Sequence, residues 1–330
     1  MTIVNSVRDP SEVAEARRRA VGLARRMGLA EDVEARIALV ATELATNLLK
    51  HAGEGVVAIH EFADADGSGI ELLALDKGPG MVDVARCMID GFSTAGSPGT
   101  GLGAVARVSD RYAIYSRPGS GTAVMARFLA TRAAPSLTPE IGVVIDTYPG
   151  ENVCGDSWIT GNGGTGPTLL LVDGSGHGPL AAHAADTATR AFSANIDKEC
   201  VPLVETIHRA LAPTRGAALA VARIDAPARV VRFVGVGNIG AVLVAGDGAR
   251  RMASYNGTVG HVAPRIREFT YSFTNRPLVI LHSDGLSARW EIDSYPGLAA
   301  SHPSLVAGRV FRDHRRGRDD ATVVAMRAAS

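Results

Sequence analysis

Aspartates in four motifs of the C-terminal half could bind divalent cations. Asp156 lies in Cys-Gly-Asp-Ser, Asp173 in Val-Asp-Gly-Ser-Gly-His-Gly, Asp284 in Ser-Asp-Gly and Asp319 in Asp-Asp-Ala-Thr. Carboxylates that leave strand ends can converge on hard cations, which prefer oxygen ligands. Two such ions activate a bridging water and clamp a phosphate for in-line attack. A single Asp-Gly pair is more often a turn, but four acidic motifs in this order favour a metal site.

A second set of residues, in the N-terminal half, could bind a nucleotide. Glu43 and Asn47 are one helical turn apart, so they can address a nucleophile and a magnesium ion from one face. Asp76 follows an apolar run and can accept a hydrogen bond from a purine amino group. Glycine-rich segments permit close backbone approach and offer amides to phosphate oxygens. Each feature alone is more often a surface residue or a turn. The glycines are Gly78, Gly80, Gly99, Gly101 and Gly103.

The elements that must carry the N-terminal residues form the pattern of an α/β sandwich. Residues 9–28 run from Asp-Pro to glycine, which are ordinary start and stop signals of a helix. Over residues 31–52, apolar positions recur at steps of three and four, which predicts a helix with one face against a sheet. Strands are then expected over residues 56–62, 70–75, 111–116 and 122–129.

The pattern breaks at residues 131–139, which hold two prolines among small residues. We therefore expect one domain over 1–130, a linker over 131–139 and a second domain over 140–330. In the second domain short apolar runs dominate, which predicts a β-sandwich flanked by helices. Strands are expected over 141–147, 168–172, 217–224, 230–234, 241–245, 278–282 and 321–326, and helices over 179–195 and 201–211.

Composition and charge exclude several classes of protein. Lysine plus arginine equals aspartate plus glutamate at 34 each, so no basic field is present to attract nucleic acid. The basic runs 17–19 and 312–318 are interpreted as solvated faces. Three widely spaced cysteines favour a reducing cytoplasm over a disulfide framework. No apolar run reaches membrane length, so we expect neither export nor a membrane anchor.

In this order, the N-terminal motifs resemble the GHKL ATP-binding fold over about residues 10–130. Within it, Thr42-Glu43-Leu44-Ala45-Thr46-Asn47, His51-Ala52-Gly53-Glu54-Gly55 and Asp90-Gly91-Phe92-Ser93-Thr94-Ala95-Gly96 look most like the stressosome switch kinase, an anti-sigma-factor-type kinase of STAS-domain proteins. No histidine-bearing dimerisation segment precedes the fold, which disfavours a sensor histidine kinase. The loop around Pro98 and Thr100 departs from the plainer lid of that kinase.

The resemblance implies a role for each residue of the first set. Asn47 would hold the magnesium that bridges the phosphates of ATP, and Glu43 would orient or deprotonate the attacking hydroxyl. Asp76 would recognise adenine, with Thr122 on the adenine side. Lys50 could touch a phosphate or remain solvated. Gly78 and Gly80 would shape the adenine pocket, and Gly99, Gly101 and Gly103 the phosphate lid.

The C-terminal motifs resemble the PPM phosphatases, specifically the SpoIIE-like branch, over about residues 140–328. This implies two manganese or magnesium ions held by Asp156 and Asp173, with Asp173 bridging them and Gly174 adding its carbonyl. Asp284 and Asp319 would complete the site. Asp320 would support the metal ligands without binding a metal itself. His177 could act as a general acid, although its offset differs from that of the acid histidine in eukaryotic relatives. The segment 235–238 is interpreted as a structural turn.

Together, the two resemblances imply a cytoplasmic serine/threonine kinase fused to the phosphatase that opposes it. Both would act on STAS-domain proteins, either a stressosome scaffold or an anti-anti-sigma factor, with neither nucleic acid nor membrane as a partner. If both activities ran at once they would waste ATP, so this interpretation demands gating. Two alternatives stay open: the ATP domain is a non-catalytic module that regulates the phosphatase, or the chain is a scaffold without activity.

Overall fold

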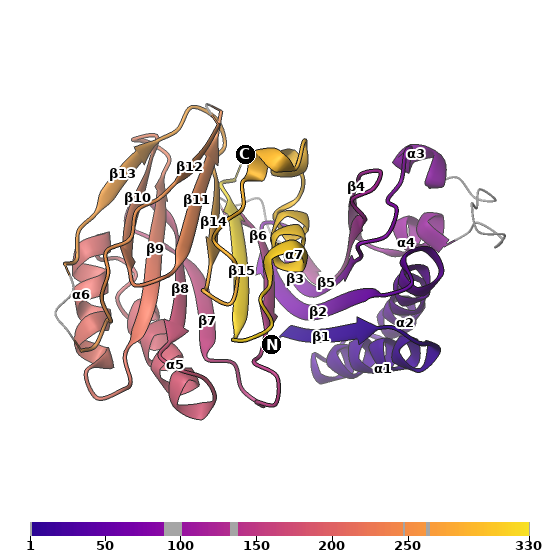
Figure 1. Ribbon diagram of the computed structural model, residues 1–330, viewed down its shortest axis with the longest axis horizontal. Coiled ribbons are helices and arrows are strands. Elements are labelled where there is room, and N and C mark those ends of the chain that lie inside the picture. Colours follow the sequence, from indigo (N-terminus) through magenta and orange to yellow (C-terminus); the bar gives the residue numbers. More distant parts are fainter. Residues whose placement is uncertain (1, 89–100, 133–137, 247, 262–264, 330) are drawn as a thin grey trace. The chain divides into compact units, whose positions relative to one another are not determined.

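The computed structural model describes residues 2–88, 101–132, 138–246, 248–261 and 265–329 (Figure 1). Its contacts divide the chain into two compact units. The first holds Met1–Pro135 together with Ala300–Arg312, and the second holds Ser136–Ala299 and Asp313–Ser330. The helix α7 (Pro303–His314) therefore belongs to the first unit for most of its length, although in the sequence it lies between segments of the second.

In the first unit two long helices cover one face of a five-stranded antiparallel sheet, in the order β1-β2-β3-β5-β4 (Figure 1). Apolar side chains of α1 and α2 form a continuous core with alternate residues of the strands. This arrangement confirms the expected α/β sandwich. The elements are β1 (Thr2–Val7), α1 (Pro10–Arg26), α2 (Glu31–Asn47), β2 (Gly55–Asp64), β3 (Gly67–Leu75), α3 (Val84–Cys87), α4 (Gly101–Val108), β4 (Arg111–Ser116) and β5 (Thr122–Arg132).

The ends of the two long helices are set by local chemistry. The Asp9 side chain accepts hydrogen bonds from the amides of Ser11 and Glu12, and Glu12 bonds back to the Asp9 amide, which completes a capping box. The helix expected over residues 31–52 changes character at Asn47, where a π-helical turn, Leu48–Ala52, replaces the last α-helical turn. Gly53, at φ 79°, then ends it.

Strand β3 presents two different faces because side chains alternate along a strand. Ile70, Leu72 and Ala74 belong to the core shared with α1 and α2. Leu73 and Leu75 lie on the opposite face, against Gly308 of α7. Within the first unit, the sheet is thus covered on both faces.

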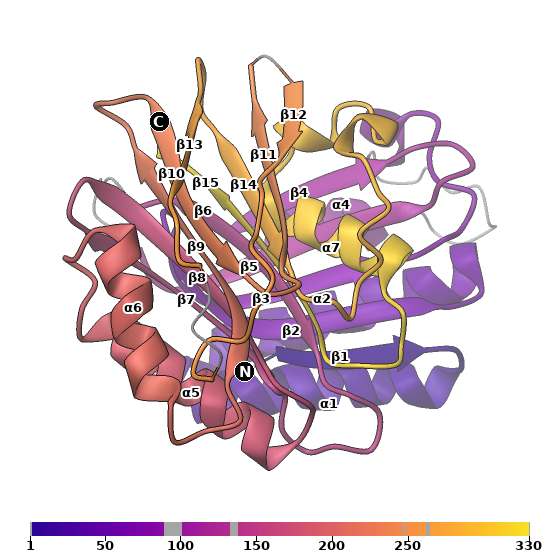
Figure 2. The same ribbon diagram turned by 60° about the vertical axis from the view of Figure 1, so that its left-hand side comes forward.

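In the second unit two five-stranded antiparallel sheets pack face to face, with apolar side chains from both sheets in one core (Figure 2). The helices α5 (Pro179–Ser193) and α6 (Cys200–Leu211) cover the outer face of one sheet. The sandwich confirms the expected fold class. One sheet holds β7 (Asp156–Gly163), β8 (Gly166–Gly174), β9 (Ala217–Asp225), β10 (Val230–Val236) and β13 (Phe269–Ser272); the other holds β6 (Glu140–Asp146), β11 (Gly240–Ala245), β12 (Gly248–Arg251), β14 (Leu278–His282) and β15 (Ala321–Arg327).

No helix among the described residues is both long and apolar enough to cross a membrane. The domain boundaries expected near residues 130 and 140 remain a prediction.

Candidate functional site

In the first unit, α2 brings Glu43 and Asn47 against the start of α4. A Cβ placed on Gly101 would lie 2.9 Å from Glu43 Oε2 and 3.4 Å from both terminal atoms of the Asn47 amide. A side chain at this position would have to displace the Glu43 carboxylate. The first residue of α4 is therefore held directly beside the two polar side chains, as a phosphate-binding helix start would be.

The other residues expected in the lid and phosphate region are placed less uniformly. Gly103 is buried within α4. Lys50 is exposed in the π-helical turn that follows Asn47. Gly99 lies outside the described residues, as do the motif 90–96 and the positions 98 and 100.

Asp76 lies immediately after β3 with one carboxylate oxygen already occupied. Asp76 Oδ1 accepts hydrogen bonds from the amides of Gly78, at 2.8 Å, and Thr122, at 3.2 Å. Burial raises the pKa of the Asp76 carboxyl above its ordinary value. The Thr122 hydroxyl bonds Ser116 at 2.9 Å, so Thr122 joins this site through its backbone. These bonds fix the plane of the carboxylate and leave Oδ2 for a ligand.

Two glycines after Asp76 are required by the space around them. A Cβ on Gly78 would lie 2.7 Å from the Ala52 methyl carbon, and one on Gly80 would lie 2.0 Å from the Arg117 carbonyl oxygen. Gly80 also adopts a φ of 69°, in the left-handed region. The turn after Asp76 therefore depends on both glycines for its shape.

In the second unit, the four acidic motifs come together at the ends of strands. Asp156 begins β7 and Asp173 nearly ends β8, and the two residues are direct partners across this antiparallel pair. Asp284 closely follows β14, and Asp319 closely precedes β15, which pairs with β14. The sheet register therefore delivers two carboxylates from each sheet of the sandwich.

A cavity of about 430 Å³ lies at this edge, and Asp173, Asp284 and Asp319 line it. Asp156 lies deeper, 5% exposed, and accepts a 2.6 Å hydrogen bond from the Ser283 hydroxyl. Asn238, also in the lining, donates a short hydrogen bond to Asp284. Neutral side-chain donors thus set the orientation of two of the four carboxylates, those of Asp156 and Asp284.

The acidic side chains strongly perturb one another. Burial raises the pKa of Asp173, and the negative charges of Asp156, Asp284 and Asp319 raise it further. Burial is also the main reason why the pKa of Asp156 is raised. Carboxylates with raised pKa values are an expected feature of a site built for cations, because bound cations remove the repulsion.

The donor set of this site suits divalent cations in its chemistry more than in its present geometry. Within the described parts of the chain, no three His, Cys, Asp or Glu side chains form a group that could hold a metal ion as they stand. Ser283 and Asn238 each occupy an oxygen of one carboxylate. The residues fit hard cations by chemistry, since every charged donor is an oxygen and the net charge is negative.

The remaining residues of the second set support the loops. Asp320 accepts hydrogen bonds from the amides of Tyr148 and Gly155, both at 2.8 Å, so it ties the segment before β7 to the start of β15. A Cβ on Gly174 would lie 2.2 Å from the Ala181 carbonyl oxygen, which fixes the backbone of Gly174 against α5. His177 stacks on Tyr148 at 4.6 Å between ring centroids and lies outside the cavity lining.

The sequence interpretation missed two kinds of contributor. Ser283 and Asn238 carry no charge: Ser283 precedes Asp284 directly in the chain, whereas Asn238 ends the segment 235–238, which the sequence indicated only as a structural turn. The basic run 312–318 is not simply a solvated face: the guanidinium of Arg312 donates hydrogen bonds to the carbonyl oxygens of Asp76 and Ser120, and Arg315 forms an ion pair with Asp146.

Comparison with known proteins gives a family for each half. A family model described as histidine kinase-like ATPase domain matches residues 7–128, and the Stage II sporulation protein E (SpoIIE) model matches residues 164–329. The serine/threonine-protein kinase RsbT of Bacillus subtilis (strain 168) is 36% identical over 115 residues, which cover 35% of this chain and 86% of RsbT.

Two solved structures extend the comparison. A chain from work on the bacterial stressosome, as a modular system adapted to control secondary messenger signalling, has a TM-score of 0.53 at 27% identity, and the match covers 57% of this chain and 99% of that one. RsbX in complex with magnesium has a TM-score of 0.53 at 18% identity, with 60% and 98% covered, which shows the shared fold alone.

These findings confirm both resemblances that the motifs indicated. The chain carries an RsbT-like kinase domain and a PPM-type phosphatase domain, an arrangement of bacterial stress signalling. Because the Stage II sporulation protein E model matches half of the chain, the protein belongs to the SpoIIE family.

Proposed function

We propose that this chain both adds phosphate to and removes phosphate from serine or threonine of a STAS-domain protein. The observation that carries the proposal is that each unit holds a set of polar residues suited to one of the two reactions. Glu43, Asn47 and Gly101 meet in the first unit, and the acidic cavity around Asp173 lies in the second.

For the phosphatase, Asp156, Asp173, Asp284 and Asp319 would hold two manganese or magnesium ions, with the Gly174 carbonyl as a further ligand. Such ions, when bound, supply an activated water and neutralise phosphate charge. Ser283 and Asn238 orient the carboxylates of Asp156 and Asp284, and Asp320 fixes the loops that carry them. No side-chain nucleophile is required.

For the kinase, Asp76 would bind the adenine amino group through Oδ2, which accepts no hydrogen bond from the described residues, with the shape of the turn set by Gly78 and Gly80. Asn47 would hold the magnesium that accompanies ATP. Glu43 would take the proton of the attacking serine or threonine hydroxyl. The oxygen of that hydroxyl forms the bond to the γ-phosphorus as the bond to ADP breaks and ADP leaves. Amides at the start of α4, from Gly101 to Gly103, would contact the phosphates, with Gly99 preceding them.

Three of the expected residues have supporting or open roles. Thr122 contributes its backbone amide to Asp76. Lys50, exposed one turn after Asn47, is proposed to touch a phosphate. His177 is left without a catalytic role, because the cavity lining does not include it.

The phosphatase is tested by release of phosphate from a phosphorylated STAS-domain protein, with and without Mn²⁺. We expect Mn²⁺-dependent release by the native chain and by Glu43→Gln, and a loss of at least about a hundredfold in Asp173→Asn. Release that does not depend on Mn²⁺ or on Asp173 contradicts the phosphatase assignment.

The kinase is tested with radiolabelled ATP and the unphosphorylated STAS-domain protein, in the Asp173→Asn background to prevent removal of the label. We expect transfer that is abolished by adding Glu43→Gln. Tight ATP binding without transfer would instead support the alternative that the first unit is a nucleotide-binding regulator of the phosphatase.

A further inference from the structure

One face of α7 follows strand β3 along its length. The residues on this face are four apart, at Ser304, Gly308 and Arg312, and therefore stack on one side of the helix. All three belong by their contacts to the first unit, together with β3 and the turn after it. The C-terminal part of the sequence thus supplies a piece of the unit that carries the nucleotide-site residues.

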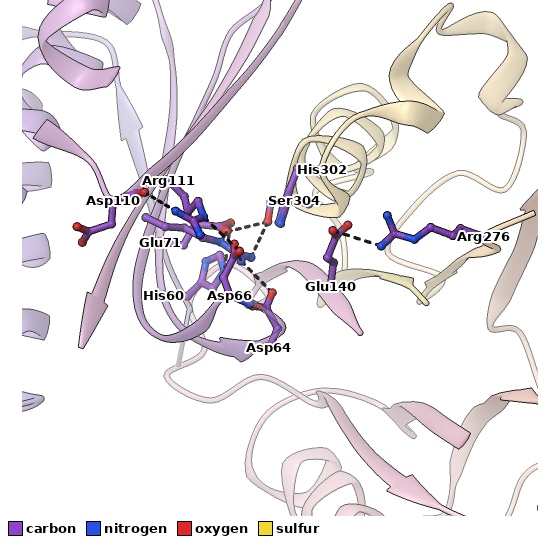
Figure 3. A network of polar contacts seen from close by, with 11 residues as sticks. His60, Asp64, Asp66, Glu71, Asp110, Arg111, Glu140, Arg276, His302 and Ser304 are labelled. Carbon is purple, nitrogen blue, oxygen red and sulfur yellow. Dashed lines mark hydrogen bonds and ion pairs between the residues drawn. The ribbon is translucent and has the colours of Figure 1, made fainter. Parts of the chain in front are cut away.

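The first contact of this face is polar and buried. The Ser304 hydroxyl donates a 2.7 Å hydrogen bond to Glu71 Oε2 and accepts one of 3.3 Å from Arg127. Figure 3 shows Ser304 pointing from its helix toward Glu71. Neither Glu71 nor Arg127 is exposed, so the hydroxyl anchors the N-terminal end of α7 at a fixed height along β3.

The middle contact sets how closely the helix approaches. A Cβ on Gly308 would lie 2.7 Å from Leu73 Cδ2 and 2.8 Å from Leu75 Cδ2. A larger residue would require these two leucine side chains or the helix itself to shift. Gly308 therefore allows α7 to pack closely against β3. This close packing determines the position of Arg312, one helical turn further along.

The last contact is at the nucleotide site itself. Arg312 Nη1 donates a hydrogen bond to the backbone carbonyl of Asp76, and Nη2 donates one of 2.9 Å to the carbonyl of Ser120. At Gly121, with φ 76°, a Cβ would lie 2.6 Å from the Arg312 guanidinium and 2.1 Å from the Asp76 carbonyl oxygen. The guanidinium thus clamps the two chain segments that surround the Asp76 carboxylate.

We propose that Arg312 is a positioning residue of the adenine site, and that α7 completes this site from the C-terminal part of the chain. The inference rests on the proposed role of Asp76 in adenine recognition. Amides of Gly78 and Thr122 fix Asp76 Oδ1, and Arg312 fixes the peptide plane that follows the same residue. With Oδ1 and this peptide plane both fixed, Asp76 Oδ2 is held in one orientation. As a hydrogen-bond acceptor it can then distinguish an adenine amino group from a guanine carbonyl.

The test compares binding of the imido analogues of Mg·ATP and Mg·GTP to the full chain by calorimetry. The variants are Arg312→Gln, Arg312→Lys and, as matched control, Arg17→Gln, which alters an exposed arginine of α1. We expect Arg312→Gln to weaken binding of the adenine analogue about tenfold or more, as loss of a charged hydrogen-bond donor predicts. The guanine analogue should be affected much less, so that the preference for adenine shrinks. Arg312→Lys should recover part of the affinity and of the preference for the adenine analogue, and Arg17→Gln should match the native chain.

The outcomes separate this inference from the proposed function. If the native chain binds neither analogue, or binds both equally, the proposed adenine site itself fails. If the native chain prefers adenine and Arg312→Gln keeps the same affinity and preference, the role of Arg312 is refuted. Equal weakening of both analogues in Arg312→Gln would show a general structural defect and would also overturn the proposal.

Discussion

Replacing Arg127 with methionine should destabilise the first unit severely. Arg127 is a buried residue of β5, directly opposite Glu71 on β3. Its guanidinium contacts Glu71 at 2.6 Å and both Asp64 and Asp66 at 2.9 Å. Although burial lowers the pKa of Arg127, Glu71 and Asp64 raise it above its ordinary value. Methionine keeps much of the volume and removes the charge that balances these carboxylates.

The expected magnitude follows from the burial of the partners. Glu71 and Asp64 have side chains that are 0% and 1% exposed, so water cannot replace the guanidinium. Removing one partner of a buried ion pair costs about 3–5 kcal/mol. The matched control is Arg232→Met, because Arg232 also bridges two carboxylates from a strand but its side chain is 31% exposed. That change should cost about 1 kcal/mol or less.

Native-state hydrogen exchange measures the destabilisation by Arg127→Met in the first unit and by Arg232→Met in the second separately. A single unfolding midpoint of a two-unit chain does not separate them. The free energy of opening of amides in β3 and β5 should fall by about 3–5 kcal/mol in Arg127→Met. Adding Glu71→Gln should recover part of this loss, since one uncompensated charge is then removed. A fall below about 1 kcal/mol, or no recovery in the double variant, would refute the interpretation of this network as a mutually dependent buried cluster.

Three further predictions concern the acidic site and its link to α7. Because the pKa of Asp173 is raised to about 9 from 3.8, the unfolded chain loses this proton first; without metal, stability should fall as pH rises from about 4 through about 9. Melting temperatures in EDTA should show this fall, which Asp173→Asn should reduce and Mn²⁺ should reverse; a rise with pH would contradict it. Ser283→Ala should raise the Mn²⁺ concentration for half-maximal phosphatase activity about tenfold, whereas an unchanged value would exclude an orienting role. His314, the last residue of α7, and Arg316 form backbone hydrogen bonds with Ser287 and Gly285 in the loop of Asp284, and the same segment then supplies Asp319. An ATP analogue should therefore shift the same Mn²⁺ midpoint in the native chain and not in Arg312→Gln; equal midpoints with and without the analogue would exclude such coupling.

Much of the fold could be predicted because its signals are local. Interior strands such as β3 and β14 are nearly continuous apolar runs, and the helix stripe of α2 has its regular period. Within the described residues, the strands that were not expected are β1, β7, β12 and β13, and all of them lie at sheet edges. Edge strands are short or rich in polar residues and glycine, which hides them from a search for apolar runs.

The acidic site could be predicted in outline because each aspartate lies near a strand end. The hydrogen bonds that support it could not be predicted, because the partners of Ser283 and Asn238 are defined only once the strands are paired. The same holds for Glu71 and Arg127, each a lone charge within an apolar run. The position of Arg312 beside Asp76 depends on a helix far along the sequence that packs on β3, and no spacing rule predicts such a contact.

The most direct test of the proposed function is to follow label on one STAS-domain protein with two complementary variants of the same chain. Asp173→Asn, given radiolabelled ATP, should place phosphate on a serine or threonine and leave it there. Glu43→Gln with Mn²⁺ should then remove label from that same residue. Label that Asp173→Asn cannot add, or that Glu43→Gln cannot remove, would contradict the claim that one chain catalyses both opposing reactions.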